Sequence, residues 1–266
     1  MMLIKRRSLI QIWKLIAWET GKYRIVACMI EAVLTIDDIA SANTPALVDY
    51  LVEKGIPALM FAVGEHIEKF PEYVVYALQH GMIVGNHSYS HPDFAEISYE
   101  EGVCEIEKCE ALLDDIYKKA GVERKFRPFR FPYGSKGGEN KDKYERYLGN
   151  KGFSKVDDRK ITGSLWKEKG LDKDIDTLWT FDFAEYRIRP ESGFSMDDVM
   201  KRVHEGDPEN GGMLLEAGTY HIILMHDHEE TLAMVSDYYK IMLEHVAENG
   251  VTFVKPEFYV NTCEWI

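Results

Sequence analysis

Short apolar runs alternate with longer amphipathic stretches along most of the chain. The apolar runs predict strands at residues 29–36, 58–63, 82–84, 126–131, 153–156, 177–181, 221–225 and 251–254. The amphipathic stretches predict helices at residues 44–54, 65–79, 98–120, 142–150, 195–204 and 230–249. Gly55 and Gly250 follow two of these helices, where a left-handed residue commonly ends a helix. Pro71 predicts a break inside a third helix.

Strands and helices that alternate in this way predict parallel strands joined by right-handed helical crossovers. About seven or eight such units favour an α/β fold with a closed or nearly closed barrel, and an open doubly wound sheet is the alternative. No G-x-G-x-x-G or G-x-x-x-x-G-K-[ST] motif follows the first predicted strand. The phosphate-binding versions of the open sheet therefore lose support.

The composition of the chain limits the classes of partner and substrate that it can bind. The chain has 266 residues, a usual length for such a barrel, and its 45% hydrophobic and 29% charged residues are typical of a globular protein. The 45 acidic and 32 basic residues give a net charge of -13, and no basic run is visible beyond residues 5–7. We therefore expect no nucleic-acid partner, and a strongly anionic substrate is disfavoured. The four cysteines form no C-x-x-C pair, so we expect reduced thiols.

The start of the chain has some features of a signal peptide. Lys5-Arg6-Arg7 precedes a mostly apolar stretch at residues 8–18, but Lys14 interrupts that stretch and no cleavage site of small residues is clear. No window reaches the roughly 20 apolar residues that span a bilayer. We expect residues 1–22 to be an N-terminal extension before one domain at residues 23–266, no membrane span, and a cytoplasmic location.

Polar residues suited to chemistry follow several of the predicted strands. They are Asp37 and Asp38, the stretch Asn86-His87-Ser88-Tyr89-Ser90-His91, Arg130 before Pro132-Tyr133-Gly134, Asp182, and His226-Asp227-His228. Singly, each has an ordinary explanation, because an aspartate pair can end a turn and a histidine after a strand can belong to the core. The carboxyl ends of parallel strands meet at one face of a barrel, however, so a single site is the better interpretation.

The residue types also predict a reaction. Two imidazoles and one carboxylate suit zinc, and three protein ligands leave one position open for water. A second carboxylate can take a proton from water, and a histidine on the far side can protonate a leaving amine. An arginine can keep the base ionised, and a backbone N–H can hold a developing oxyanion. The set predicts metal-dependent hydrolysis.

In this order, the motifs resemble those of the polysaccharide deacetylase family, also called the NodB-homology domain or carbohydrate esterase family 4. Thr35-Ile36-Asp37-Asp38-Ile39 resembles the first motif, and Gly85-Asn86-His87-Ser88-Tyr89-Ser90-His91 resembles the second. Arg130-Phe131-Pro132-Tyr133-Gly134 resembles the third, and Leu224-Met225-His226-Asp227 resembles the fifth. The resemblance runs over residues 29–254. It implies a distorted (β/α) barrel of about seven parallel strands, with the catalytic domain at residues 23–266.

The resemblance also implies a role for each matching residue. The ligands of one divalent metal ion, zinc or alternatively cobalt or nickel, would be Asp38, His87 and His91. Asp37 resembles the catalytic base, and Arg130 resembles the arginine that orients it. His226 resembles the general acid, and the backbone N–H of Tyr133 resembles the oxyanion donor.

The chain departs from the family pattern at three points. Ile39 replaces a glycine after the aspartate pair. The fourth motif usually ends Asp-x-x-Asp-Trp and here reads Asp182-Phe183-Ala184-Glu185-Tyr186, so Glu185 stands where an aspartate tunes the acid histidine. We expect Glu185 to contact His226, with Asp182 as the next candidate for that task. The third departure is the lack of a clear export signal, since most family members are secreted or membrane-anchored; an extracellular location is the alternative.

The implied activity is removal of N-acetyl groups from N-acetylglucosamine-containing glycans or oligosaccharides, so the expected partner is a carbohydrate substrate. Alternatives on the same fold are hydrolysis of an acetylxylan ester or of an allantoin-like cyclic amide. A different class is a non-catalytic carbohydrate-binding descendant. The sequence specifies no oligomeric state.

Overall fold

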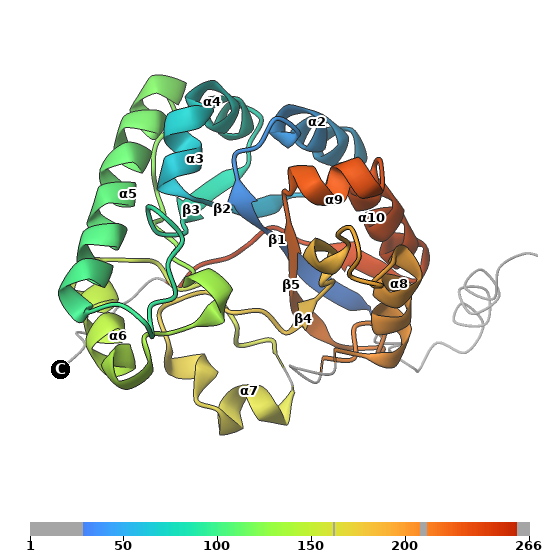
Figure 1. The fold of residues 1–266 in the computed structure, drawn as a ribbon. Coiled ribbons are helices and arrows are strands. Elements are labelled where there is room, and N and C mark those ends of the chain that lie inside the picture. The colour runs from blue at the N-terminus through green and yellow to red at the C-terminus, as the bar shows by residue number, and fades with distance from the viewer. Residues whose placement is uncertain (1–28, 162, 208–211, 260–266) are drawn as a thin grey trace, which may run out of the picture.

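One parallel sheet forms the centre of the molecule. The computed structural model describes residues 29–161, 163–207 and 212–259, and six parallel strands lie within them (Figure 1). The sheet order is β3-β2-β1-β5-β4, and β6 pairs with the first part of β1. The strands are β1 (Ile30–Ile39), β2 (Ala58–Ala62), β3 (Ile83–Asn86), β4 (Phe181–Asp182), β5 (Tyr220–His226) and β6 (Val251–Phe253). This arrangement confirms the predicted α/β class.

Strand β1 is buried along nearly its whole length, as its almost continuous apolar sequence predicts for a strand covered on both faces. Its side chains alternate between two cores. Leu34 and Ile36 face the helices, while Val33 joins Phe61 and Ile222 in a cluster inside the barrel. This alternation directs Val33, Thr35 and Asp37 inward, and a register shift between Ile36 and Ile39 lets the next residue, Asp38, line the same cavity as Asp37.

Helices cover the outside of the sheet (Figure 1). The α-helices are α2 (Thr44–Lys54), α3 (Gly64–Lys69), α4 (Pro71–Gln79), α5 (Tyr99–Ala120), α6 (Lys141–Asn150), α7 (Ser164–Glu168), α8 (Met196–Glu205), α9 (Glu229–Met234) and α10 (Tyr238–Glu248). Short 3₁₀ turns lie at η1 (Pro132–Gly134), η2 (Gly138–Asn140), η3 (Leu171–Lys173) and η4 (Glu185–Arg187).

Most predicted helices are present with small shifts of their ends, and the predicted break at Pro71 separates α3 from α4. The single helix predicted at residues 230–249 is wrong. It is divided into α9 and α10 because Asp237 adopts a left-handed conformation with φ 58° between them. Helix α7 and the 3₁₀ turns were not predicted.

Two predicted strands, at residues 126–131 and 153–156, are also wrong. Each contributes only an isolated bridge, Asn86 to Phe129 and Val156 to Phe258. Pro128 lies within the first segment and offers no backbone N–H for a ladder. The described residues thus contain six strands, and the expected count of about seven is not confirmed.

The 126–131 segment nevertheless connects the two edges of the sheet. Asn86 N donates to Pro128 O at 2.9 Å and Arg130 N donates to Asn86 O at 3.0 Å, which ties the segment to β3. Thr177 N donates to Phe129 O at 2.8 Å, and the chain then enters β4. A few isolated hydrogen bonds, in place of a continuous strand ladder, therefore close the barrel between β3 and β4. The fold is a distorted (β/α) barrel.

The expected N-terminal extension at residues 1–22 and the boundary at residue 23 lie outside the described residues. Within the described ranges, no helix combines the length and apolar character needed to cross a membrane. Of the two cysteines described, Cys104 is exposed and Cys109 is buried, and both are free thiols.

Candidate metal and catalytic site

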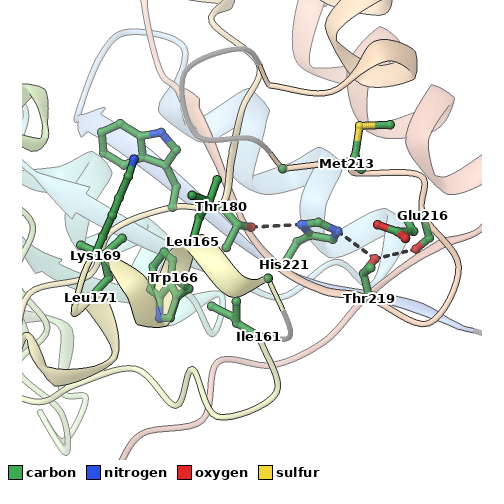
Figure 2. Close-up of a pocket in the computed structure, with 13 residues that line it drawn as sticks. Ile161, Leu165, Trp166, Lys169, Leu171, Thr180, Met213, Glu216, Thr219 and His221 are labelled. Atoms are coloured by element: carbon green, nitrogen blue, oxygen red, sulfur yellow. Dashed lines mark hydrogen bonds between the residues drawn. The ribbon is translucent and has the colours of Figure 1, made fainter.

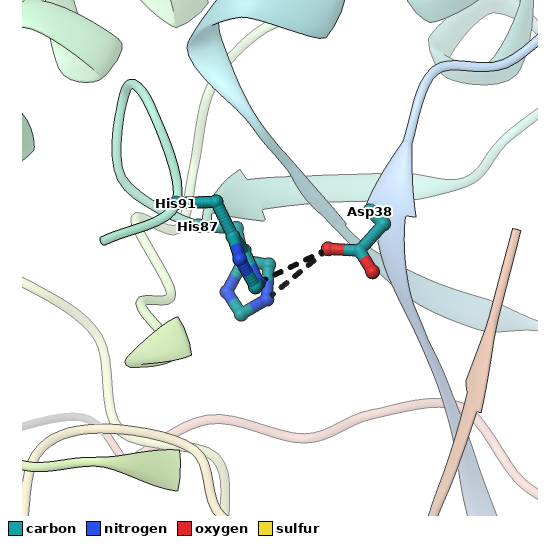
Figure 3. Close-up of side chains that lie close together, drawn as sticks. All are labelled: Asp38, His87 and His91. Carbon is teal, nitrogen blue, oxygen red and sulfur yellow. Dashed lines mark ion pairs between the residues drawn. The ribbon is translucent and has the colours of Figure 1, made fainter. Parts of the chain in front are cut away.

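The sequence-predicted residues converge on one end of the barrel. Asp37 and Asp38 lie in the last three residues of β1, and β5 ends in His226, which lies directly opposite Asp37 in the strand pairing. The loop after β3 brings His87 and His91 to the same place (Figure 3). A cavity of about 450 Å³ opens between these side chains. The predicted clustering at the carboxyl ends of the strands is therefore present.

Asp38, His87 and His91 form a candidate metal site. Asp38 Oδ1 lies 3.3 Å from His91 Nε2 and 3.6 Å from His87 Nε2, and one ligand atom from each residue lies within 4.8 Å of the others. Asp38 Oδ1 is buried and has no hydrogen-bond partner. A buried acceptor without a donor beside two imidazole nitrogens is the arrangement that a divalent cation satisfies.

The hydrogen bonding of His87 supports the same fit. Its Nδ1 lies 2.8 Å from the carbonyl oxygen of Arg130, which can only accept, so Nδ1 carries the proton. In the neutral ring the lone pair of Nε2 then points toward Asp38. Metal-ligating histidines are commonly held in this way through their second nitrogen.

Electrostatics keep Asp38 and His91 in the protonation states that a metal requires. Burial opposes ionisation of Asp38, but the hydrogen bond from His228 and the nearby imidazoles, His87 foremost, hold the pKa of this carboxyl well below its usual range. Burial and the neighbouring His87 lower the pKa of His91 to about 4. The site therefore offers an ionised carboxylate and a neutral His91 imidazole at neutral pH.

Asp37 is held by a buried arginine. Arg130 is fully buried, and its Nη1 donates to Asp37 Oδ1 at 2.7 Å and to Thr35 Oγ1 at 2.8 Å. Its Nε donates to the Thr177 carbonyl at 2.7 Å, which fixes the plane of the guanidinium. The other Asp37 oxygen, Oδ2, lies 3.4 Å from His87 Nε2 and so faces the candidate metal position.

His226, on the strand next to Asp37, contacts the Glu185 carboxylate and lies near that of Asp182. Glu185 Oε1 accepts a hydrogen bond from the His226 backbone N–H and lies 3.1 Å from the ring Nδ1. Burial opposes the charge on His226, but Glu185 outweighs it and raises the pKa of His226 to about 10. Burial also raises the pKa of Asp182 to about 7, while Ala184 N donates to its Oδ1 at 2.8 Å. The ligand atoms of Asp182, Glu185 and His226 lie close enough to hold an ion, but the bond between Glu185 and His226 favours proton chemistry for this group.

Tyr133 lies at the mouth of the cavity with 68% of its surface exposed, and its ring centre is 4.5 Å from that of His91. Its φ of 58° turns the backbone within η1. The loop that follows is anchored because Lys136 Nζ donates to Asp174 Oδ2 at 2.8 Å and to Asp176 Oδ1 at 2.7 Å. These contacts fix the path of the backbone that carries the expected oxyanion donor.

A separate cluster of carboxylates lies close to this anchor. Glu145, Asp174 and Asp176 place ligand atoms within 4.8 Å of one another. Burial and the nearby Asp176 raise the pKa of Glu145 to about 9, so this carboxyl is neutral at pH 7. Because Lys136 already pairs with both aspartates, we assign the cluster to ion pairing.

The sequence analysis assigned no role to three residues that support the site. His66 Nδ1 lies 2.7 Å from the Asp38 carbonyl, and His228 Nε2 lies 2.7 Å from Asp38 Oδ2. Asp227 is buried and accepts hydrogen bonds from the loop that follows Asp38. The signal was present for two of them, because His228 and Asp227 follow His226 directly at the end of a predicted strand.

A second cavity, of about 190 Å³, lies elsewhere (Figure 2). Trp166, Leu165 and Ile161 line it together with Thr219 and His221, which belong to the amino end of β5. Trp179 lines both cavities and stands between them. The second cavity contains none of the residues predicted to carry the chemistry.

Comparisons with known proteins support the family resemblance. Residues 29–153 match the family model described as polysaccharide deacetylase. The peptidoglycan-N-acetylglucosamine deacetylase of Bacillus cereus is 38% identical over 105 residues, which cover 39% of this chain and 36% of that protein. The match thus spans about a third of the relative's length.

Solved structures extend the likeness to most of the fold. The Bc1960 peptidoglycan N-acetylglucosamine deacetylase has a TM-score of 0.59 at 22% identity, over 85% of this chain and 86% of that one. A mutant of BA3943, a CE4-family pseudoenzyme from Bacillus anthracis, has a TM-score of 0.57 at 19% identity, over 84% of this chain and 64% of that one. At these identities the likeness concerns the fold alone. The motifs, the family match and the fold agree, and they confirm the predicted resemblance of this chain to the polysaccharide deacetylase family.

Proposed function

We propose that this protein is a metal-dependent hydrolase that removes N-acetyl groups from N-acetylglucosamine-containing glycans or oligosaccharides. One observation carries the proposal. An Asp-His-His donor set, with an unpartnered carboxylate oxygen, lies beside a carboxylate held by a buried arginine, and a histidine held by a carboxylate lies on the neighbouring strand and lines the same cavity. These groups are the ones that amide hydrolysis needs.

We assign the roles from position. Asp38, His87 and His91 would hold the divalent metal, which supplies a Lewis acid when bound. Asp37 accepts a proton from the attacking water, since the bond from Arg130 orients its carboxylate. The Tyr133 backbone N–H would hold the oxyanion that develops on the acetyl carbonyl.

His226 completes the reaction. Its imidazolium donates a proton to the sugar nitrogen as the C–N bond breaks, so that the products are acetate and a free amine. Glu185 stabilises the charged ring through Nδ1, which leaves Nε2 for the substrate. Water supplies the oxygen that ends in acetate, and no redox partner is needed.

Zinc is our proposal for the metal, because two imidazoles and one carboxylate are ligands that it favours, and cobalt and nickel accept the same set. The two deacetylases compared above are peptidoglycan N-acetylglucosamine deacetylases, which favours N-acetylglucosamine as the sugar. An acetylxylan ester and an allantoin-like cyclic amide stay as alternatives on this fold. The expectation of a cytoplasmic location also stays a prediction.

An acetate-release screen tests the proposal. Zinc-loaded protein is incubated with chitooligosaccharides, peptidoglycan fragments and acetylxylan, from which acetate is measured, and with allantoin, from which the ring-opened acid is measured. An Asp37→Asn variant is the control for contaminating activity. We expect acetate from the chitooligosaccharides or the peptidoglycan fragments, and none from the control. Binding of these glycans with no product from any substrate would contradict the hydrolase and support a carbohydrate-binding role.

A further inference from the structure

We propose that His228 is a positioning residue that holds the Asp38 carboxylate in the orientation that metal binding needs. The inference rests on the proposed function only through its metal site. No motif identified in the sequence assigns a role to His228, which lies in the loop between β5 and α9.

The two oxygens of Asp38 have different surroundings. Oδ2 lies 2.7 Å from His228 Nε2, and a carboxylate can only accept, so this nitrogen carries the proton and donates it. Oδ1 has no hydrogen-bond partner and faces His91 and His87 at 3.3 and 3.6 Å. The bond to His228 thus occupies one oxygen and directs the other at the candidate metal position.

His228 is itself anchored. Its backbone N–H donates to the Tyr238 hydroxyl at 3.4 Å, and that hydroxyl donates to the His226 carbonyl at 2.5 Å. On the other side of Asp38, His66 Nδ1 lies 2.7 Å from the backbone carbonyl. Asp38 is therefore held at its main chain and at Oδ2, and only Oδ1 is left for a ligand.

This arrangement also distinguishes positioning from direct ligation. A nitrogen that donates a hydrogen bond to Asp38 has no lone pair for a metal. Outer partners of metal ligands typically contribute about 10- to 100-fold in metal affinity, since the ligand loses its fixed orientation without them. We expect His228 to act within that range.

Zinc affinity measures the effect without reference to catalysis. Metal-free wild type, His228→Ala, His228→Phe and His228→Gln are titrated with zinc in competition with a chromophoric chelator at one pH. The phenylalanine side chain keeps a ring but has no hydrogen-bond donor. His228→Phe therefore replaces His228→Ala in the comparison if the alanine variant does not fold. The glutamine side chain places an N–H close to the position of Nε2. His80→Ala is the matched control, because His80 is exposed and its ring bonds to the Tyr76 carbonyl and packs on the Tyr76 ring, and it is not among the residues that line the site cavity.

We expect the two donorless variants, His228→Ala and His228→Phe, to bind zinc about 10- to 100-fold more weakly than wild type. His228→Gln should stay within about threefold of the wild-type affinity. His80→Ala should bind as wild type does. At saturating zinc the donorless variants should regain acetate release to within a few-fold. Wild-type affinity in the donorless variants would overturn the inference, and so would a glutamine variant as weak as they are.

The same titration separates this inference from the proposed function. Wild-type protein that binds zinc but releases no acetate from any screened substrate would contradict the deacetylase activity alone. Normal acetate release with zinc affinity unchanged across the His228 series would contradict the role of His228 alone.

Discussion

The Glu185 carboxylate lies against His226, with Oε1 accepting the backbone N–H at 2.5 Å and standing 3.1 Å from the ring Nδ1. Glu185 is fully buried, although the family pattern has a shorter aspartate at this place. Ala184, with φ 58°, turns the chain directly before it, and the glutamate side chain reaches the histidine from that turn. The extra methylene is thus accommodated within η4.

This pair makes the pKa of His226 depend on Glu185. Glu185 raises that pKa to about 10 against the effect of burial, so the imidazolium persists well above the ordinary value near 6.5. Glu185→Gln removes the charge, and the pKa of His226 should fall. A histidine titration by NMR on metal-free protein measures this directly. The alkaline limb of the pH profile of kcat/KM should move to lower pH in the loaded enzyme.

Glu185→Asp is the matched variant, because it keeps the charge and restores the family residue. It should retain most activity and a raised pKa for His226. An unshifted NMR titration in Glu185→Gln would show that another group tunes the ring. Asp182 would then be the candidate, since its carboxyl is buried close to the same histidine.

The parallel architecture was predictable because buried parallel strands have long apolar runs, and β1 and β5 show them clearly. The interruption of the barrel at residues 126–131 was not predictable. These residues have an apolar pattern, but they lack the hydrogen bonds of a strand ladder. Pro128 was a sequence feature that argued against a strand in this segment. The division between α9 and α10 depends on the left-handed Asp237, which periodicity does not report.

The reacting groups were predictable from motifs because their residue types and strand-end positions are written in the sequence. The residues that hold these groups in position were not predictable. His66 reaches Asp38 only because α3 follows β2 at the adjacent strand end, and that contact depends on the register between β1 and β2. Arg130 was assigned to Asp37 by resemblance, whereas its bond to the Thr177 carbonyl requires the closed barrel.

Asp37→Asn should lower kcat by on the order of 10²- to 10⁴-fold, because an amide cannot accept the proton from water. Zinc affinity should change little, since Asp38 supplies the carboxylate of the metal site. Stopped assays of acetate and the chelator competition measure the two quantities on the same preparation. A variant with full kcat would remove Asp37 from the mechanism.

Removal of the metal should abolish activity, and one zinc ion per chain should restore it. His87→Ala should lose metal, because it removes one of three ligands whose Nε2 is oriented by the bond to the Arg130 carbonyl. Elemental analysis after dialysis gives the stoichiometry. Unchanged metal content together with full activity in His87→Ala would place the metal site elsewhere.

Asp227 connects the catalytic strand end to the loop after β1. Its backbone N–H donates to the Asp37 carbonyl at 3.0 Å. Its buried carboxylate accepts hydrogen bonds from Ser41 Oγ at 2.9 Å, Asn43 Nδ2 at 3.1 Å and Thr44 Oγ1 at 2.5 Å. Ser41, Asn43 and Thr44 lead into α2, so one side chain fixes the path between the metal site and the helix.

Asp227→Ala should therefore destabilise the fold by on the order of 3 kcal/mol, because three buried donors lose their acceptor at once. For a chain of this size that corresponds to a fall of roughly 6–12 °C in Tm, which thermal unfolding followed by circular dichroism can measure. Glu244→Ala is the control. Glu244 is an exposed partner of Lys54 at 2.9 Å, and such a surface pair contributes about 0–1 kcal/mol. Equal Tm values for the two variants would show that the loop after β1 is held by other contacts, and that burial of Asp227 contributes little to the stability of the site.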